Sequence, residues 1–392
     1  MAGNLGAISD NGLVETVLST TLGASPFGFF TTIFDTAIYT NGVSVPQAIT
    51  NVSNVLAIAP LGGSPPVLLY TIFYEDCLFG AGNPSNPSRL YFSDPGTIDS
   101  WTPSNFIDVA PDDGGAITGL IFQFGVLIIF KETGIYYLTG TDPTNFILNQ
   151  AMADVGCIAP KTLKSLNGII VFLGRQGSRL GVYTFINGVV TRISQNIDPS
   201  LQFIAVPQLI NSCAFVDFPY YYLSVPILPS TVDNEQFVFD SSINAWTHFT
   251  GWNANTLVSW LGGSDLGFIF YGDGVTSDII QCFVGYQDQG HNYPFSIKTK
   301  YFDLQVPELV KLNKIFYLTK ESQWPNTGQI TYDLDFAGLY TAPINVTPDN
   351  WFVFPQTAQG QFTSIQFSDL SNNPLKLAGF SIIGEKWVVR PR

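Results

Sequence analysis

Residues 117–130 read ITGLIFQFGVLIIF and form the strongest apolar stretch of the chain. The polar Gln123 interrupts the stretch, and Gly119 and Gly125 lie within it. A membrane-spanning helix needs roughly 18 or more consecutive apolar residues, so this segment is too short to cross a bilayer. Short apolar runs on either side of a glycine are typical of paired β-strands. The sequence therefore predicts two paired strands here and no membrane insertion by this chain.

Tight-turn dipeptides recur along the rest of the sequence. Both residues of Asn-Gly and Asp-Gly tolerate positive φ, so these pairs favour two-residue hairpin turns between antiparallel strands. Short β-rich runs such as residues 67–73, 126–130 and 169–173 lie between them. The six dipeptides are Asn11-Gly12, Asn41-Gly42, Asp113-Gly114, Asn167-Gly168, Asn187-Gly188 and Asp273-Gly274.

The spacing of these strands favours a β-propeller. Strand clusters recur about every 40–50 residues over the first 290 positions, which is the length of a four-stranded propeller blade. This spacing predicts about five to seven blades over residues 1–289, with residues 1–28 as an arm or a closing strand. A sandwich or jelly roll is the competing all-β architecture, but two sheets rarely absorb so many residues.

The composition supports an all-β protein that associates with other protein. Hydrophobic residues make up 46% of the chain and charged residues only 12%, with 32 Phe, 17 Tyr and two Met. Aromatic and β-branched residues suit pleated sheets, whereas good helix formers are scarce. A chain with so little charge tends to bury surface against other protein, so a lone monomer is not expected.

Charge divides the chain into two parts. Residues 1–289 carry 7 basic and 22 acidic residues, a net charge of −15, whereas residues 290–392 carry 9 and 8, a net of +1. The second part alternates polar and apolar residues, as in residues 362–367, which predicts half-buried strands of a small β-sandwich-like docking domain. Its candidate interface residues are Lys298, Lys300, Lys311, Lys314, Arg390 and Arg392.

A series of segments resembles the tail propeller proteins of phages, the family that includes the nozzle and tail-stabilisation proteins of short-tailed phages. The resemblance covers about residues 70–200, with weaker similarity at KTKY (298–301) and WVVRPR (387–392). The segments are PSRLYFSDPG (87–96), SW (100–101), FIDV (106–109), DDG (112–114), ITGL (117–120), LIIFK (127–131), GIYYLTG (134–140), VGCIAP (155–160) and GVVTRISQNI (188–197).

This resemblance implies a structural protein of the virion tail, assembled in the host cytoplasm. Such chains form a ring below the portal and adaptor and close or extend the DNA ejection channel. We expect a homo-oligomeric ring, with a hexamer preferred, that contacts the portal, adaptor or other tail proteins. DNA would pass through without sequence-specific binding. An acidic wall suits such passage because it repels the DNA backbone, although solubility explains the acidity at least as well.

The segment from Ser93 to Trp101 resembles the Asp-box turn of sialidase propellers, although its Asp follows Ser directly and its Trp lies two positions late. We interpret it as a structural turn in which Asp94 bonds the backbone of its own turn and Gly96 takes a positive φ. In this interpretation Trp101 packs between blades. The alternative function is a glycan-binding or sialidase-like propeller that acts in host adsorption.

Catalytic chemistry has little support in the sequence. The adjacent carboxylates Glu75-Asp76 and Asp112-Asp113 do not converge by themselves, because neighbouring strand residues point to opposite faces. Arg175 and Arg179 share one loop, where such residues more often tie loops together. His248 lies in an aromatic strand, where packing explains it. We therefore expect no enzyme and no cofactor.

The four cysteines also lack the spacing of a functional site. Cys77, Cys157, Cys213 and Cys282 form no CxxC pair and have no histidine at metal-ligand spacing. The sequence predicts buried free thiols and no metal site.

Overall fold

The computed structural model describes residues 3–8, 15–53, 55–113, 115–261, 267–276, 278–283, 287–288, 291–292, 295–303, 310–319, 329–335, 339–343, 350–354, 359–369 and 377–386. The chain forms two compact units, Met1–Cys282 and Phe283–Arg392. The division lies slightly before the expected one after residue 289. Each unit is described by itself.

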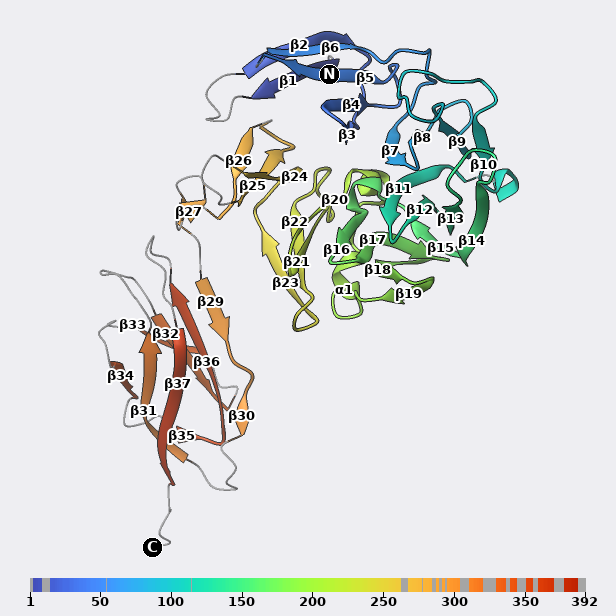
Figure 1. Cartoon of the computed structure of the whole chain (residues 1–392). Coiled ribbons are helices and arrows are strands. Elements are labelled where there is room, and N and C mark those ends of the chain that lie inside the picture. Colours follow the sequence, from blue (N-terminus) through green and yellow to red (C-terminus); the bar gives the residue numbers. More distant parts are fainter. Residues whose placement is uncertain are drawn as a thin grey trace, which may run out of the picture. The chain divides into compact units, whose positions relative to one another are not determined.

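The first unit is a β-propeller whose described part forms six blades, each an antiparallel sheet of three to five strands (Figure 1). Strands follow one another in chain order within each sheet, so every blade is a meander. The blades are β3 (Phe29–Ile33) to β6 (Val55–Pro60) through β4 (Thr36–Thr40) and β5 (Gln47–Val52); β7 (Tyr70–Tyr74), β8 (Cys77–Ala81), β9 (Arg89–Phe92) and β10 (Phe106–Asp108); β11 (Ile117–Gln123), β12 (Val126–Lys131), β13 (Gly134–Thr139) and β14 (Ile147–Ala153); β15 (Val155–Cys157) with β16 (Lys164–Leu166), β17 (Ile169–Gln176), β18 (Arg179–Ile186) and β19 (Val189–Arg192); β20 (Cys213–Asp217), β21 (Tyr220–Val225), β22 (Glu235–Asp240) and β23 (Ala245–Thr250); and β24 (Ala254–Leu261), β25 (Gly267–Asp273) and β26 (Ile279–Gln281).

The core of the propeller lies between successive blades. One apolar cluster joins blades 2 and 3, where Leu90 and Phe92 share a cluster with Leu127 and Ile129. Each of these side chains is nearly or fully buried. Burying an aliphatic or aromatic side chain of this size contributes roughly 1.5–3 kcal/mol, so contacts between blades stabilise the whole unit.

Short helical segments connect some of the strands. Lys161, in the 3-10 helix η2 (Pro160–Thr162), donates through Nζ to the backbone oxygen of Asn255 at the start of β24. The same Nζ lies 5.6 Å from the ring centroid of Phe27, just before β3. Blades 4, 6 and 1 therefore meet at this lysine. The remaining segments are η1 (Pro111–Asp113), α1 (Asp198–Leu201) and η3 (Val206–Asn211).

The first residues of the chain form a separate hairpin. Strands β1 (Gly3–Ile8) and β2 (Glu15–Leu22) pair with each other in a two-stranded sheet. Among the described residues, neither strand pairs with the sheet of β24–β26.

The second unit is β-sandwich-like. Two sheets share a core in which Ile315 of one sheet and Ile330 and Ile365 of the other are fully buried. The rings of Phe367 and Phe380, from opposite sheets, lie 5.4 Å apart between centroids. The first sheet comprises β29 (Phe295–Lys298), β30 (Phe302–Asp303), β32 (Gln329–Leu334), β33 (Leu339–Pro343) and β36 (Phe362–Asp369), and the second β31 (Val310–Thr319), β34 (Asn350–Val353), β35 (Gln359–Gly360) and β37 (Leu377–Lys386); β27 (Gln287–Asp288) pairs with β28 (His291–Asn292) before them.

The tight-turn predictions had mixed outcomes. Asn167-Gly168 and Asn187-Gly188 are two-residue hairpin turns, and all four residues have positive φ. Asn41-Gly42 lies in the longer β4–β5 connection, Asp113 lies in η1, and Asp273-Gly274 begins the β25–β26 connection, so those three predictions of tight turns were wrong. Asn11-Gly12 and Gly114 lie outside the described residues.

Candidate functional site

In each of blades 1–5 a turn of only two residues leads into the second full strand; these turns join β3–β4, β7–β8, β11–β12, β16–β17 and β20–β21. In a meander of this kind all such turns lie on one face of the propeller. The ring end of Phe124 lies 3.1 Å from the position that a Cβ on Gly168 would occupy, so neighbouring turns are close together. We call this surface the inner-turn face. Its residues are 34–35, 75–76, 124–125, 167–168 and 218–219.

Three phenylalanines project from the inner-turn face. Phe34 is 75% exposed, Phe124 is 70% exposed and Phe218 is 65% exposed. Phe34 and Phe124 also have positive φ, 52° and 50°. A bulky residue in this region is strained by roughly 1–3 kcal/mol, and such strain tends to persist at functional positions. Within the isolated chain, these two rings are not buried in a core and their backbone does not favour a bulky residue. The isolated chain therefore gives no reason for a phenylalanine at either turn.

The charge on the inner-turn face is acidic. Asp35 and Asp76 are exposed within the turns, and Asp217 is exposed beside Phe218. The ten residues of the five turns include no lysine, arginine or histidine. The face therefore combines exposed aromatic rings with negative charge.

The predicted turn at Ser93–Trp101 lies in the β9–β10 connection. The Asp94 carboxylate accepts hydrogen bonds from Ser100 Oγ at 2.6 Å, Thr102 Oγ1 at 2.8 Å and Asn105 Nδ2 at 2.8 Å. These bonds, that of Ser100 above all, hold the pKa of Asp94 below its usual value. We expected the carboxylate to bond backbone groups, but the donors are side chains, because a longer connection brings three of them within reach.

The other residues of this turn have structural contacts. Ser93 is buried and its Oγ donates to the backbone oxygen of Thr97 at 2.7 Å. Gly96 has a φ of 76°, and its N–H donates to the Asp76 oxygen on the inner-turn face. Trp101 packs against a cluster that contains Ile38 of blade 1 and Leu78 of blade 2. The loop therefore fastens two blades together and supports the inner turn of blade 2.

We predict that Asp94 makes stability depend on pH. Its folded pKa is lowered, so its contribution is present above the ordinary value of 3.8 and is lost as pH falls through the folded pKa. Asp94→Asn should lower the melting temperature at pH 7 and reduce the further loss between pH 5 and about pH 2. Circular dichroism melts at both pH values measure this.

The matched control is Asp112→Asn, because Asp112 is an exposed carboxylate in η1. It should leave the melting temperature at pH 7 unchanged. An Asp94→Asn protein with the same acid-induced loss as the original chain would contradict the assignment.

The candidate catalytic carboxylates lie apart. Glu75 and Asp76 form the inner turn of blade 2, while Asp112 and Asp113 lie in η1. Asp113 pairs with Lys131, whose buried Nζ also donates to the backbone oxygens of Val109 and Ala110 at 2.9 Å. This pair ties the connection between blades 2 and 3 to β12.

The histidine whose side chain the structure describes, His248, has a packing contact and an ionisable partner. His248 stacks on Phe237 with ring centroids 4.8 Å apart, and its Nε2 contacts the Glu235 carboxylate. Both residues lie on neighbouring strands of blade 5. No hydroxyl or thiol nucleophile is recorded as a partner of this ring among the described residues.

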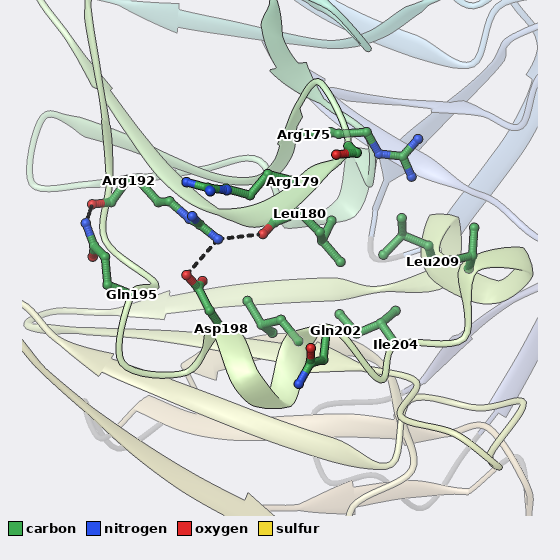
Figure 2. Close-up of a pocket in the computed structure, with 12 residues that line it drawn as sticks. Arg175, Arg179, Leu180, Arg192, Gln195, Asp198, Gln202, Ile204 and Leu209 are labelled. Carbon is green, nitrogen blue, oxygen red and sulfur yellow. Dashed lines mark hydrogen bonds and ion pairs between the residues drawn. The ribbon is translucent and has the colours of Figure 1, made fainter.

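Arg175 and Arg179 do not tie loops together. They flank the two-residue turn Gly177-Ser178 between β17 and β18, and neither guanidinium has a polar partner among the described residues (Figure 2). Instead both line a cavity of about 690 Å³, which Arg192 also lines. The sequence interpretation missed this convergence, because Arg192 lies two strands away along the chain.

The candidate interface residues of the second unit are only partly described. Lys298, Lys300 and Lys314 are exposed. Lys314 on β31 is directly opposite Val353 on β34 and Ile383 on β37, which are 61% and 43% exposed. Directly opposed residues share one face of a sheet, so these three form a mixed basic and apolar patch. The side chain of Lys311 and the residues Arg390 and Arg392 lie outside the described part.

The four cysteines are buried and free, which confirms that prediction. Burial raises the pKa of Cys77 to about 11 and that of Cys157 to about 12, so these thiols stay protonated at neutral pH. No cluster of three potential metal ligands occurs among the described residues. Within the same residues, no helix is long and apolar enough to cross a membrane.

Comparisons with known proteins give no family assignment. No protein-family model matches the chain, and no curated protein matches it. Similar solved structures include a protein from Lactobacillus plantarum, with 12% identity, 71% of this chain and 90% of that chain covered, and a TM-score of 0.40. The N-terminal domain of Nup159 has 10% identity over 65% of this chain and 71% of its own, with a TM-score of 0.35.

A third solved structure belongs to an exo-β-1,3-galactanase from Phanerochaete chrysosporium. It has 9% identity, covers 98% of this chain and 100% of its own, and has a TM-score of 0.30. Likenesses this distant carry no argument about function, and the fold assignment rests on the sheet topology described above.

Proposed function

We propose that this chain is a non-enzymatic structural subunit of a phage tail that assembles into a ring of identical copies, with a hexamer preferred. In this proposal the ring lies below the portal and adaptor and closes or extends the DNA ejection channel. The phage assignment rests on the sequence resemblance over residues 70–200. The structural observation that carries the assembly role is the inner-turn face with its exposed phenylalanines.

Phe34 and Phe124 cost the isolated chain free energy. Each combines a strained backbone with a largely exposed aromatic ring, so the isolated chain gains little from either side chain. Burial of such a ring in a protein contact contributes roughly 1.5–3 kcal/mol, which offsets the strain. Exposed aromatic residues are also enriched in protein interfaces. These positions are therefore explained best by a contact with another protein.

We assign the sandwich-like unit of the next copy as the partner of this face. The inner-turn face offers aromatic rings beside Asp35, Asp76 and Asp217, and the second unit offers the patch of Lys314, Val353 and Ile383. Both surfaces are part apolar and part charged, and their charges are opposite. Such complementarity fixes the register of an interface and speeds association.

A structural role also fits the candidate chemistry. The two carboxylate pairs that the sequence offered as catalytic candidates lie on different elements of the propeller. Asp94 and Asp113 already have hydrogen-bond or ion-pair partners that stabilise the fold. A net charge of −15 over residues 1–289 disfavours adhesion to DNA and is compatible with a conduit.

Reversing charge on the second unit tests this contact. The variant Lys314→Glu should slow assembly roughly 10-fold or more near 0.01 M salt, where screening is weak, and much less at 1 M. Stopped-flow light scattering follows the rate. The charge-conserving variant Lys314→Arg should assemble normally. Equal rates for all three proteins at low salt would contradict the assigned contact.

A further inference from the structure

The cavity beside β17 and β18 is unusual for its charge. The first unit has four arginines, and three of them, Arg175, Arg179 and Arg192, line this one cavity. The surrounding unit is strongly acidic, so general surface composition does not explain the gathering. A volume of about 690 Å³ lies within the usual range of small-molecule sites.

The three arginines come from three neighbouring strands, β17, β18 and β19. The register pairs Gln176 with Arg179 and Arg175 with Leu180, so Arg175 and Arg179 lie on opposite faces of the sheet, beside the two-residue turn at whose end the cavity opens. Arg192 is on the next strand, β19, opposite Tyr183 of β18. After β19 the chain runs through α1 and η3, which supply the other wall. Figure 2 shows side chains from both walls around the cavity.

The three guanidinium groups are unequally satisfied. Arg192 Nη2 donates to the Leu180 oxygen at 2.9 Å and pairs with Asp198 Oδ2 at 2.7 Å (Figure 2). Its Nε is buried without a hydrogen-bond partner. Leaving a buried donor without a hydrogen-bond partner is energetically costly. Arg175 and Arg179 have no polar partner for their guanidinium groups in the described part of the chain, so the donors of these two side chains remain available.

The single carboxylate of the lining does not neutralise this charge. Asp198 accepts a hydrogen bond from Ser194 Oγ at 2.8 Å and pairs with Arg192. Three arginines against one aspartate leave the lining with an excess of two positive charges. Guanidinium groups stay charged in proteins and bind carboxylates and phosphates through paired N–H donors. The cavity therefore has the chemistry of an oxyanion site.

The remaining lining residues restrict the body of the ligand. Leu201, Ile204 and Leu209 are buried side chains that form a firm apolar floor. Ser178, Gln195 and Gln202 add polar groups to the lining. None of the 12 lining residues is aromatic, so no ring is present to stack on a nucleobase. This favours a small molecule with hydroxyl groups and an acidic group.

We propose that this cavity binds an oxyanion, a carboxylate or a phosphate, carried by a sugar-sized polyhydroxylated molecule. The arginines bind the acidic group, and the serine and glutamines contact hydroxyl groups above the apolar floor. This activity goes beyond the ring-forming role and does not depend on it, because the cavity lies on the connections around β17–β19 rather than on the inner-turn face.

Isothermal titration calorimetry on the full chain tests the proposal with three probes. Glucuronate carries the carboxylate, glucose 6-phosphate carries the phosphate, and glucose is the neutral reference. At least one acidic sugar should bind 10-fold or more tightly than glucose, and the stronger of the two identifies the acidic group. Inorganic phosphate should compete with it. Failure of both acidic sugars to bind more tightly than glucose overturns the proposal.

Variants separate this cavity from general charge attraction. Arg179→Gln and Arg175→Gln each remove an unpartnered guanidinium and should weaken binding 10-fold or more while the melting temperature stays unchanged. The control is Arg89→Gln, because Arg89 is an arginine of blade 2 that pairs with Asp108 and lies outside the cavity. Equal losses in Arg179→Gln and Arg89→Gln would overturn the proposal. The result does not bear on ring assembly, which light scattering measures separately.

Discussion

The double variant Phe34→Asn/Phe124→Asn is expected to abolish ring assembly without destabilising the propeller. Asparagine adopts positive φ more readily than phenylalanine, because its short polar side chain tolerates the left-handed region. Relief of this strain should offset the loss of the Phe34 contact with Phe73, whose ring lies 5.9 Å away between centroids. We expect the free energy of unfolding to stay within about 1 kcal/mol of the original or to rise. Removal of two aromatic contacts from every interface should reduce assembly by 100-fold or more.

Chemical denaturation and light scattering measure the two effects on the same samples. The matched control is Val275→Asn, which changes a residue that is 64% exposed in the β25–β26 connection, at the opposite ends of the strands from the inner turns. This control should assemble normally. If the double variant formed rings as well as the original chain, the inner-turn face would not be the interface.

At the inner turns, the sequence predicts the strands but not the residues that join them. The stretch 117–130 forms two antiparallel strands, β11 and β12, as its apolar pattern indicates. The turn between them is Phe124-Gly125, which no standard turn preference selects, because a bulky residue at positive φ is unfavourable in isolation. Local propensity therefore locates the strands, whereas the residue in the turn reflects a use outside the isolated chain.

Long-range contacts account for the other differences. The Asp94 turn is built from residues close together in the sequence, so local turn chemistry was informative there, whereas Trp101 packs against Ile38 and Leu78, which are distant in the sequence. The arginine cavity depends on the path of residues 193–211, which passes over the β17–β18 turn. No short sequence pattern predicts the course of these residues. The buried side chain of Lys131 is another example, because its Nζ donates to backbone oxygens of the connection between β10 and η1, 22 and 21 residues earlier in the chain.

Deletion of residues 290–392 is expected to leave a folded acidic propeller that no longer assembles. The apolar clusters of the first unit end at Cys282, so the deletion removes none of their members. The deleted residues include the patch of Lys314, Val353 and Ile383, which we assign to the next copy's inner-turn face. Circular dichroism should show a cooperative β-sheet melt, and light scattering should show a monomer. Rings formed by the truncated chain would show that the second unit is not the partner.

Cryo-electron microscopy of the assembled full chain tests the central claim most directly. The account predicts a closed ring of identical copies in which Phe34, Phe124 and Phe218 are buried against the sandwich-like unit of a neighbour. A particle population that contains only monomers, or rings in which these three side chains face solvent, would contradict it.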